Sequence, residues 1–192
     1  MRHRPLGRTG IQVSPYALGT LMFATAMGNE PEESARIIHK ALDADINFVD
    51  TADAYGDSED VVGRALQGRR DSVVLATKFS RPTGKDQDPN RRGASRRWIV
   101  TAVEDSPRRL NTDHIDLYQL HLPDPRTDIE ETLSTWASWC GGRWARDCSP
   151  AASARARTTP CGAPVCPVPT SAPSTRPTGP RPWRTRTCAA VP

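Results

Sequence analysis

The segment SVVLATKF, residues 72–79, is a near-continuous apolar run. Such runs are typical of strands that are buried on both faces of a parallel sheet. Other short β-rich segments end at Thr20, span residues 46–52 (INFVDTA) and span residues 114–121 (HIDLYQLH). Helical patterns alternate with these segments: one begins at residue 31, two cover residues 61–66 and 98–110, and one begins at residue 129. We therefore expect four successive strand–helix units and an α/β fold with a parallel sheet.

Periodicity does not distinguish an open parallel sheet from a closed barrel, but two absent motifs bear on the choice. No G-x-G-x-x-G follows the first strand segment, and no G-x-x-x-x-G-K-[ST] occurs in the sequence. Both motifs place backbone amides at a helix start, where they bind phosphates. Their absence counts against an open sheet of the dinucleotide-binding or P-loop type.

Four polar residues lie at or just beyond the predicted carboxyl ends of these strands. Asp50 ends one strand, and Tyr55 lies in the turn after it. Lys78 is near the end of the next strand, and His121 ends the last one. In a parallel α/β barrel this edge carries the catalytic groups. A single Tyr or His at a strand end is usually a packed structural residue, but four such side chains on three consecutive strands favour an active site.

These residue types suit the reduction of a carbonyl group. Hydride that reaches a carbonyl carbon leaves an alkoxide, which needs a proton, and the Tyr55 phenol can donate it. The Lys78 ammonium would stabilise the phenolate that remains, and Asp50 would fix and partly neutralise Lys78. His121 could orient the carbonyl oxygen by donating a hydrogen bond. The hydride itself would come from a cofactor, because no side chain supplies one.

Several blocks of the sequence carry a family resemblance. The segments FVDTADAYGDSEDVVGRAL, VVLATKF and LNTDHIDLYQLHLPDP, together with GIQVSPYALGT, resemble the signature segments of the aldo/keto reductases in their order and spacing. The resemblance covers about residues 5–134. It implies a (β/α)8 TIM barrel, of which residues 1–138 would form about the first four β/α units. It also implies NADPH as the cofactor, bound without a Rossmann motif.

The same resemblance implies roles for individual residues. Tyr55 would be the proton donor, Lys78 and Asp50 its tuning pair, and His121 the residue that orients a small carbonyl substrate; no metal is implied. The residues near the nicotinamide end of NADPH would be Gly19, Thr20 and Asp50. Some relatives of this fold are regulatory subunits of channels, so the resemblance also allows an inactive, truncated or non-catalytic protein that lacks the cofactor-binding half.

Two positions depart from the family pattern. Asp45 stands where the family usually has Gly, at a left-handed helix cap that Asp tolerates less well. Pro107 lies inside the third predicted helix, where the family often has Leu, and an interior Pro costs about 3 kcal/mol or more.

Residues 139–192 differ in composition from the rest of the chain. They contain no Leu, Ile, Phe, Tyr or Met, but they hold 10 of the 18 prolines, all 5 cysteines, and 8 Arg against one acid. A segment without large aliphatic residues buries too little apolar surface to offset its chain entropy. We therefore expect a disordered tail after residue 138. The tail has no aromatic interleaving and no known motif, which favours a solvated segment over a nucleic-acid partner.

The composition of the tail suggests a hypothesis about its origin. Its Arg, Ala, Pro, Gly, Thr and Ser have GC-rich codons, and a shifted reading of residues 135–144 can encode apolar residues at helical spacing. A frameshifted continuation of the family sequence is one explanation, and a divergent disordered extension is the other.

Targeting signals are not evident in the sequence. The charged N-terminus is followed by no apolar run, and no stretch approaches 18 apolar residues. We therefore expect a cytoplasmic protein without a membrane partner.

Overall fold

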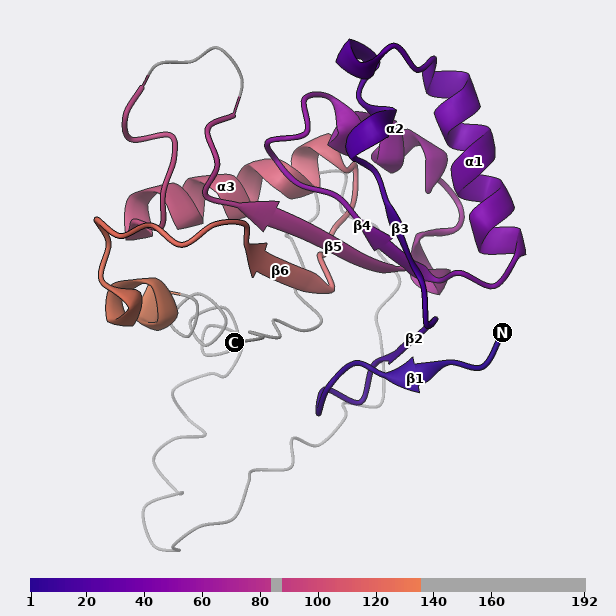
Figure 1. The fold of residues 1–192 in the computed structure, drawn as a ribbon, viewed down its shortest axis with the longest axis horizontal. Coiled ribbons are helices and arrows are strands. Elements are labelled where there is room, and N and C mark those ends of the chain that lie inside the picture. The colour runs from indigo at the N-terminus through magenta and orange to yellow at the C-terminus, as the bar shows by residue number, and fades with distance from the viewer. Residues whose placement is uncertain (84–87, 136–192) are drawn as a thin grey trace, which may run out of the picture.

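The computed structural model of the chain describes residues 1–83 and 88–135 (Figure 1). Its centre is a four-stranded parallel sheet in which each strand pairs with the next along the chain. These strands are β3 (Ala17–Gly19), β4 (Phe48–Asp50), β5 (Val74–Phe79) and β6 (Leu117–Leu120). The helices that connect them are α1 (Pro31–Asp43), α2 (Ser58–Ala65) and α3 (Arg96–Arg109), and residues 129–135 are also helical. Short 3-10 helices cover Leu21–Phe23, Thr25–Met27 and Arg70–Ser72.

This order is that of four successive units of a parallel β/α barrel. The helices lie on one side of the sheet, and the strand order β3-β4-β5-β6 follows the chain (Figure 1). The predicted α/β fold with a parallel sheet is therefore confirmed, and the predicted strands and helices are all present within the described residues. The predicted tail at 139–192 lies outside the described residues.

An antiparallel hairpin precedes the sheet. Its strands β1 (Arg4–Pro5) and β2 (Gln12–Val13) pair with each other. Asn47, just before β4, donates from its side-chain amide to the Gln12 carbonyl at 3.0 Å and accepts from the Ser14 amide at 2.7 Å. These bonds attach the hairpin to the amino-terminal end of the sheet, opposite the edge where the candidate catalytic residues were predicted.

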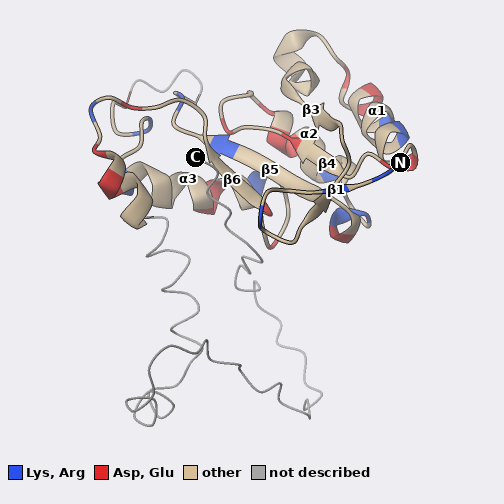
Figure 2. Ribbon diagram, turned by 60° about the horizontal axis from the view of Figure 1, so that its bottom comes forward, with Lys and Arg blue, Asp and Glu red and all other residues tan. Residues whose placement is uncertain are grey.

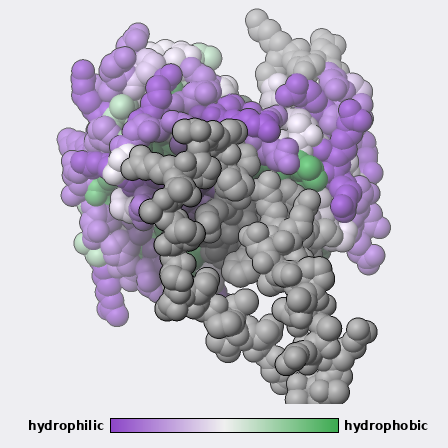
Figure 3. Space-filling model, turned by 180° about the vertical axis from the view of Figure 1, so that it is seen from behind, coloured by the Kyte–Doolittle hydropathy of each residue, from purple (hydrophilic) through white to green (hydrophobic). Residues whose placement is uncertain are grey.

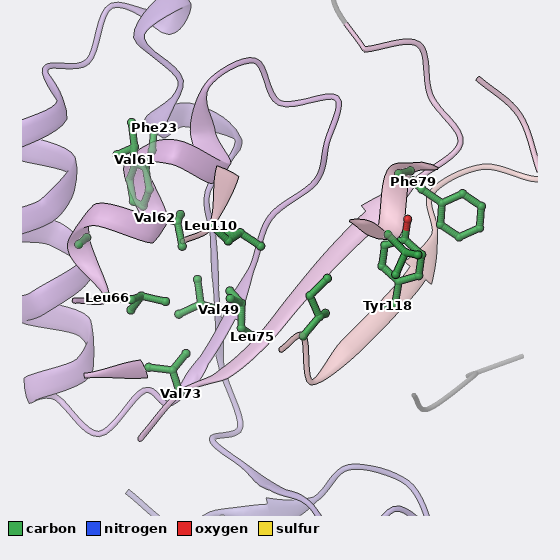
Figure 4. Packing of buried hydrophobic residues seen from close by; sticks show 14 of the residues in the cluster. Phe23, Val49, Val61, Val62, Leu66, Val73, Leu75, Phe79, Leu110 and Tyr118 are labelled. Atoms are coloured by element: carbon green, nitrogen blue, oxygen red, sulfur yellow. The ribbon is translucent and has the colours of Figure 1, made fainter. Parts of the chain in front are cut away.

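The hydrophobic core fills the space between the sheet and the helices (Figure 4). Val49 and Leu75 are fully buried in the sheet, and they meet the apolar face of α2. Beyond them the rings of Phe79 and Tyr118 stack with centroids 4.9 Å apart, which joins β5 to β6. Each fully buried aliphatic or aromatic side chain stabilises the fold by about 1.5–3 kcal/mol. The strands are therefore held in register by contacts on the face opposite the candidate site.

The end of α1 bears out the expectation for Asp45. The helix begins at Pro31, with Glu32 and Glu33 in its first turn, where the helix dipole favours acids. It ends two residues before Asp45, which has a left-handed φ of 69°. Asp therefore occupies a conformation that Gly adopts at lower cost.

The helix α3 runs through Pro107 without interruption. Ser95 caps its start, because its hydroxyl accepts a hydrogen bond from the Trp98 amide at 3.3 Å. Pro107 is buried and lies only two residues before the last helical residue, Arg109. The helix is retained because its apolar face packs against the sheet, which offsets the lost hydrogen bond.

The visible surface of the described part is mostly hydrophilic. Figure 3 shows small separate apolar spots among polar side chains on the side opposite to that of Figure 1. Among the described residues, no helix is both long and apolar enough to cross a bilayer.

Gly63 is the point of closest approach between α2 and the end of α3. A Cβ placed on it would lie 2.5 Å from the carbonyl oxygen of Leu110 and 2.6 Å from its carbonyl carbon. Both are backbone atoms, which cannot rotate away. We predict that Gly63→Ala lowers the free energy of unfolding by roughly 1–3 kcal/mol, measured by urea titration. Arg64→Ala, at an exposed position of the same helix, is the control and should change it by less than about 0.5 kcal/mol.

Candidate active site

The carboxyl edge of the sheet brings together the four residues that the sequence singled out. Asp50 is the last residue of β4, Lys78 is the second-last residue of β5, and His121 directly follows β6. Asp50 pairs with Ala76, so Lys78 lies two residues further along on the same face of the sheet. This is the face opposite to the helix-packed side chains of Leu75 and Phe79.

Lys78 is held in place by two acceptors. Its ammonium donates to Asp50 Oδ2 at 2.6 Å and to the carbonyl oxygen of Thr51 at 2.9 Å. The side chains of Lys78 and Asp50 are 14% and 29% exposed. At this degree of burial the pair is screened less than a surface ion pair, so the ammonium has a defined position.

Tyr55 lies against this ammonium. The Lys78 nitrogen is 5.1 Å from the centroid of the Tyr55 ring, within the range of a cation–π contact. The His121 ring meets the Tyr55 ring edge-on, with centroids 5.5 Å apart and planes at 86°. The turn that carries Tyr55 is closed by a hydrogen bond from its amide to the Ala52 carbonyl at 3.1 Å. All four predicted residues therefore form one cluster.

The surroundings of His121 favour the neutral form of its imidazole. Burial and then the positive charges of Lys78 and Arg81 lower the pKa of its imidazole, and Asp50 only partly opposes them. Its backbone amide donates to the Phe79 carbonyl at 2.8 Å, which fixes the start of the loop. Within the described residues its buried Nδ1 atom has no hydrogen-bond partner. A neutral imidazole carries one N–H, so the ring can donate a hydrogen bond to a substrate oxygen.

Gly19 and Thr20 adjoin the cluster at the end of β3. Gly19 is the register partner of Asp50, and a Cβ placed on it would meet no atom within 4 Å. Thr20 donates to the Asp50 carbonyl oxygen from its amide at 3.0 Å and from its hydroxyl at 3.1 Å. Ser58 in turn donates to the Thr20 carbonyl at 2.8 Å. The space next to Gly19 is therefore open, and the adjoining Thr20 is fixed by hydrogen bonds.

The sequence analysis missed a buried polar network on the helix side. Glu59 is fully buried, and it accepts hydrogen bonds from the Thr77 hydroxyl and from Arg109 Nε, both at 2.6 Å. Burial raises the pKa of Glu59, and the Arg109 guanidinium opposes this effect. The helical spacing of the sequence could have indicated this burial, because Glu59 falls on the same face of α2 as Val62, in line with Leu66 just after the helix. An acid on an apolar helix face requires a buried partner.

Asp53 belongs to the same region and is 5% exposed. Its amide donates to the Lys78 carbonyl oxygen at 3.1 Å, so it is tied to the strand that carries the candidate lysine. Burial and then the charge of Glu59 raise the pKa of the Asp53 carboxyl to about 7, although Arg109 and the Ala54 amide oppose this. No sequence signal separates Asp53 from the other acids of its segment.

A metal site is not formed in the part of the chain described here. No three His, Cys, Asp or Glu side chains come together as ligands in residues 1–83 and 88–135. The groups that the cluster offers are a phenol, an ammonium, a carboxylate and an imidazole.

Comparison with known proteins gives a consistent result. Residues 16–138 match the sequence profile of the aldo/keto reductase family. The aldo-keto reductase YhdN of Bacillus subtilis is 45% identical over an alignment of 140 positions that covers 69% of this chain and 41% of that protein. The 6-dehydroglucose reductase of Novosphingobium aromaticivorans is 40% identical over 134 residues, 63% of this chain and 41% of that protein.

A solved structure of the same kind has a similar fold. The aldo-keto reductase AKR11C1 of Bacillus halodurans, in its holo form, superposes with a TM-score of 0.61 and 38% sequence identity. The match covers 72% of this chain and 46% of that structure. This chain therefore spans less than half the length of these relatives, and its sheet corresponds to the first four strand–helix units of a (β/α)8 TIM barrel.

The raised pKa of Asp53 predicts a pH dependence of stability. Its folded pKa of about 7 lies above the ordinary value of 3.8, so the folded state binds this proton more tightly than the unfolded state. Stability contributed by the protonated carboxyl is lost as the pH rises through 7. Between pH 5.5 and 8, the wild type should lose about 2 kcal/mol of unfolding free energy relative to Asp53→Asn. Urea titrations at pH 5.5 and pH 8 measure this loss of unfolding free energy. Asp71→Asn, at an exposed position, is the control. Equal losses in the wild type and in Asp53→Asn would contradict the prediction.

The lowered pKa of His121 predicts the effect of removing Lys78. In Lys78→Met, one positive neighbour is gone and Asp50 is left unpaired, so the pKa of His121 should rise. Burial should still hold it below that of a free imidazole. A titration followed by NMR of the histidine ring protons measures the change. Lys40→Met, on the exposed surface of α1, should leave the pKa of His121 where it is in the wild type.

Proposed function

The chain belongs to the aldo/keto reductase family, and from that premise we propose that it reduces an aldehyde or a ketone to an alcohol with NADPH. One observation carries this proposal: the Lys78 ammonium is fixed by Asp50 and Thr51 against the ring of Tyr55, and the His121 ring meets the Tyr55 ring edge-on. This arrangement puts a proton donor, its charged partner and a hydrogen-bond donor around one small volume at the edge of the sheet.

The residues have distinct tasks in this reaction. When bound, the nicotinamide cofactor supplies the hydride. His121 in its neutral form donates a hydrogen bond to the carbonyl oxygen and so orients the substrate. Tyr55 gives its phenolic proton to the same oxygen, which completes the alcohol. Lys78 stabilises the phenolate that remains, and Asp50 keeps the ammonium at that place.

The residues present fit one end of the cofactor. Gly19 leaves open space at the end of β3, and the buried Thr20 and the Asp50 backbone are bonded beneath it. We assign Gly19, Thr20 and Asp50 to the nicotinamide end. NADPH is preferred here as the cofactor that the family resemblance implies. The names of two relatives, a 6-dehydroglucose reductase and an aldo-keto reductase, support reduction of a carbonyl group as the reaction.

A second candidate function is that of a non-catalytic member of the family. It is favoured by a further relative, the probable voltage-gated potassium channel subunit beta of Oryza sativa, which is 34% identical over 140 aligned residues. A protein of this kind would keep the cluster at the strand ends without turnover.

Removal of the phenolic hydroxyl tests the proposed role of Tyr55. Tyr55→Phe keeps the ring that packs against Lys78 and His121 but removes the proton donor. We predict that kcat/KM for NADPH-dependent reduction of 4-nitrobenzaldehyde falls by about 100-fold or more, measured by absorbance at 340 nm. Tyr16→Phe is the matched control, because Tyr16 is exposed and lies outside the cluster.

The same assay separates the two candidate functions. Turnover by the wild type that survives Tyr16→Phe and is lost in Tyr55→Phe supports the reductase. Equal activity in wild type and Tyr55→Phe would overturn the role of Tyr55. If NADPH shows neither saturable binding in a fluorescence titration nor turnover, the non-catalytic alternative holds.

A further inference from the structure

A pocket of about 320 Å³ lies next to the candidate active site. It is formed by the loop that follows β5 and the loop that follows β6. Ser80, directly after β5, and Leu122, directly after His121, both line it. The pocket is therefore built from loops that continue directly from β5 and β6, close in sequence to Lys78 and His121.

The walls of the pocket are fixed by hydrogen bonds made by Ser80. The Ser80 hydroxyl accepts from the Leu122 amide and donates to the Leu122 carbonyl, both at 2.9 Å. The Ser80 carbonyl accepts from the Gly93 amide at 2.8 Å. Ser80 holds a φ of 101°, which a residue with a Cβ adopts only when its surroundings enforce it. The two loops are thus joined at one residue, and the pocket between them is preformed.

The charge of the pocket is predominantly positive. Among the described residues that line it, three are arginines, Arg81, Arg92 and Arg126, and one is an acid, Asp124. Asp124 is already engaged, because its carboxylate accepts from Arg126 Nε at 3.1 Å and from the Ala94 amide at 3.3 Å. Its hydrogen bonds with Arg126 lower its pKa to about 2. Arg126 and Asp124 therefore neutralise each other, and two guanidinium charges remain.

Those two charges belong to Arg81 and Arg92. Within residues 1–83 and 88–135, neither side chain has a carboxylate or a hydrogen-bond acceptor assigned to it. Arg81 lies close to the cluster. Burial lowers the pKa of His121 most, the charge of Lys78 comes second, and the charge of Arg81 comes third. Figure 2 shows basic positions on the loops beyond the carboxyl ends of β5 and β6. Two guanidinium groups without an acceptor among the described residues, in a preformed pocket, are suited to bind an anion.

We propose that this pocket binds a carboxylate or phosphate group of the carbonyl substrate, with Arg81 and Arg92 as the residues that select it. Pro82 and Leu122 supply apolar surface for the carbon chain that joins the anionic group to the carbonyl. The substrate class is thus an aldehyde or ketone that carries an anionic group at its far end. This inference rests on the proposed reductase function, because it places the reacting carbonyl at His121 and Tyr55.

A matched pair of substrates tests the preference for a negative charge. The pair is 4-carboxybenzaldehyde and its methyl ester, methyl 4-formylbenzoate, which differ in charge but share the aldehyde ring. In Arg81→Gln/Arg92→Gln, kcat/KM for the acid should fall at least about tenfold, and that for the ester should change less than about threefold. The control is Arg64→Gln/Arg97→Gln, which removes two exposed arginines from the helices α2 and α3.

A binding measurement keeps the test independent of turnover. The full-length chain labelled with 15N is titrated with 4-carboxybenzyl alcohol and, separately, with its methyl ester. The amide signals of Gly93 and Leu122 should shift saturably with the acid only, and the shift should be lost in Arg81→Gln/Arg92→Gln. This result without turnover would remove the proposed function but leave the anion site.

Two results would overturn the anion site. The first is equal binding and equal kcat/KM for the acid and the ester in the wild type, which would make Arg81 and Arg92 ordinary surface residues. The second is a rise in the Kd of NADPH in Arg81→Gln/Arg92→Gln with an unchanged preference for the acid. That result would assign the two arginines to a cofactor phosphate instead of the substrate.

Discussion

The ion pair between Lys78 and Asp50 is the interaction on which the candidate site depends. It exists because β4 and β5 are parallel neighbours in a register that pairs Asp50 with Ala76, two residues before Lys78. Lys78 is 14% exposed, so its ammonium needs the carboxylate and the Thr51 carbonyl as acceptors. The helix-packed core on the other face of the sheet holds that register. Packing on one face therefore fixes the positions of charges on the other.

The sequence predicted the parts of the structure that depend on local pattern. Apolar runs and helical spacing identified the strands and helices, and the position of polar residues at strand ends identified Asp50, Tyr55, Lys78 and His121. The contact between Glu59 and Arg109 was not predictable in the same way, because 50 residues separate them and only the packing of α2 against α3 brings them together. A contact between residues so far apart in the sequence produces no periodic pattern in a single sequence.

The same limit applies to the loops beyond the strands. The Ser80 hydroxyl joins the loops after β5 and β6 only because its φ of 101° turns it towards Leu122. Nothing in the amino-acid sequence around Ser80 indicates this backbone conformation. Strands place Asp50 and Lys78, whereas Tyr55 and His121 stand in the segments that directly follow β4 and β6. The loops joined at Ser80 place Arg81 and Arg92, the residues proposed to select the substrate.

The proposal that Asp50 acts through Lys78 is tested most directly by a double-mutant cycle on kcat/KM. The variants are Asp50→Asn, Lys78→Met and the double variant, each assayed for NADPH-dependent reduction of 4-nitrobenzaldehyde. If the two residues work as one unit, the double variant should lose no more activity than Lys78→Met alone, because the carboxylate has no task once the ammonium is gone. Losses that multiply in the double variant, or full activity in Asp50→Asn, would contradict the dependence of the site on this ion pair.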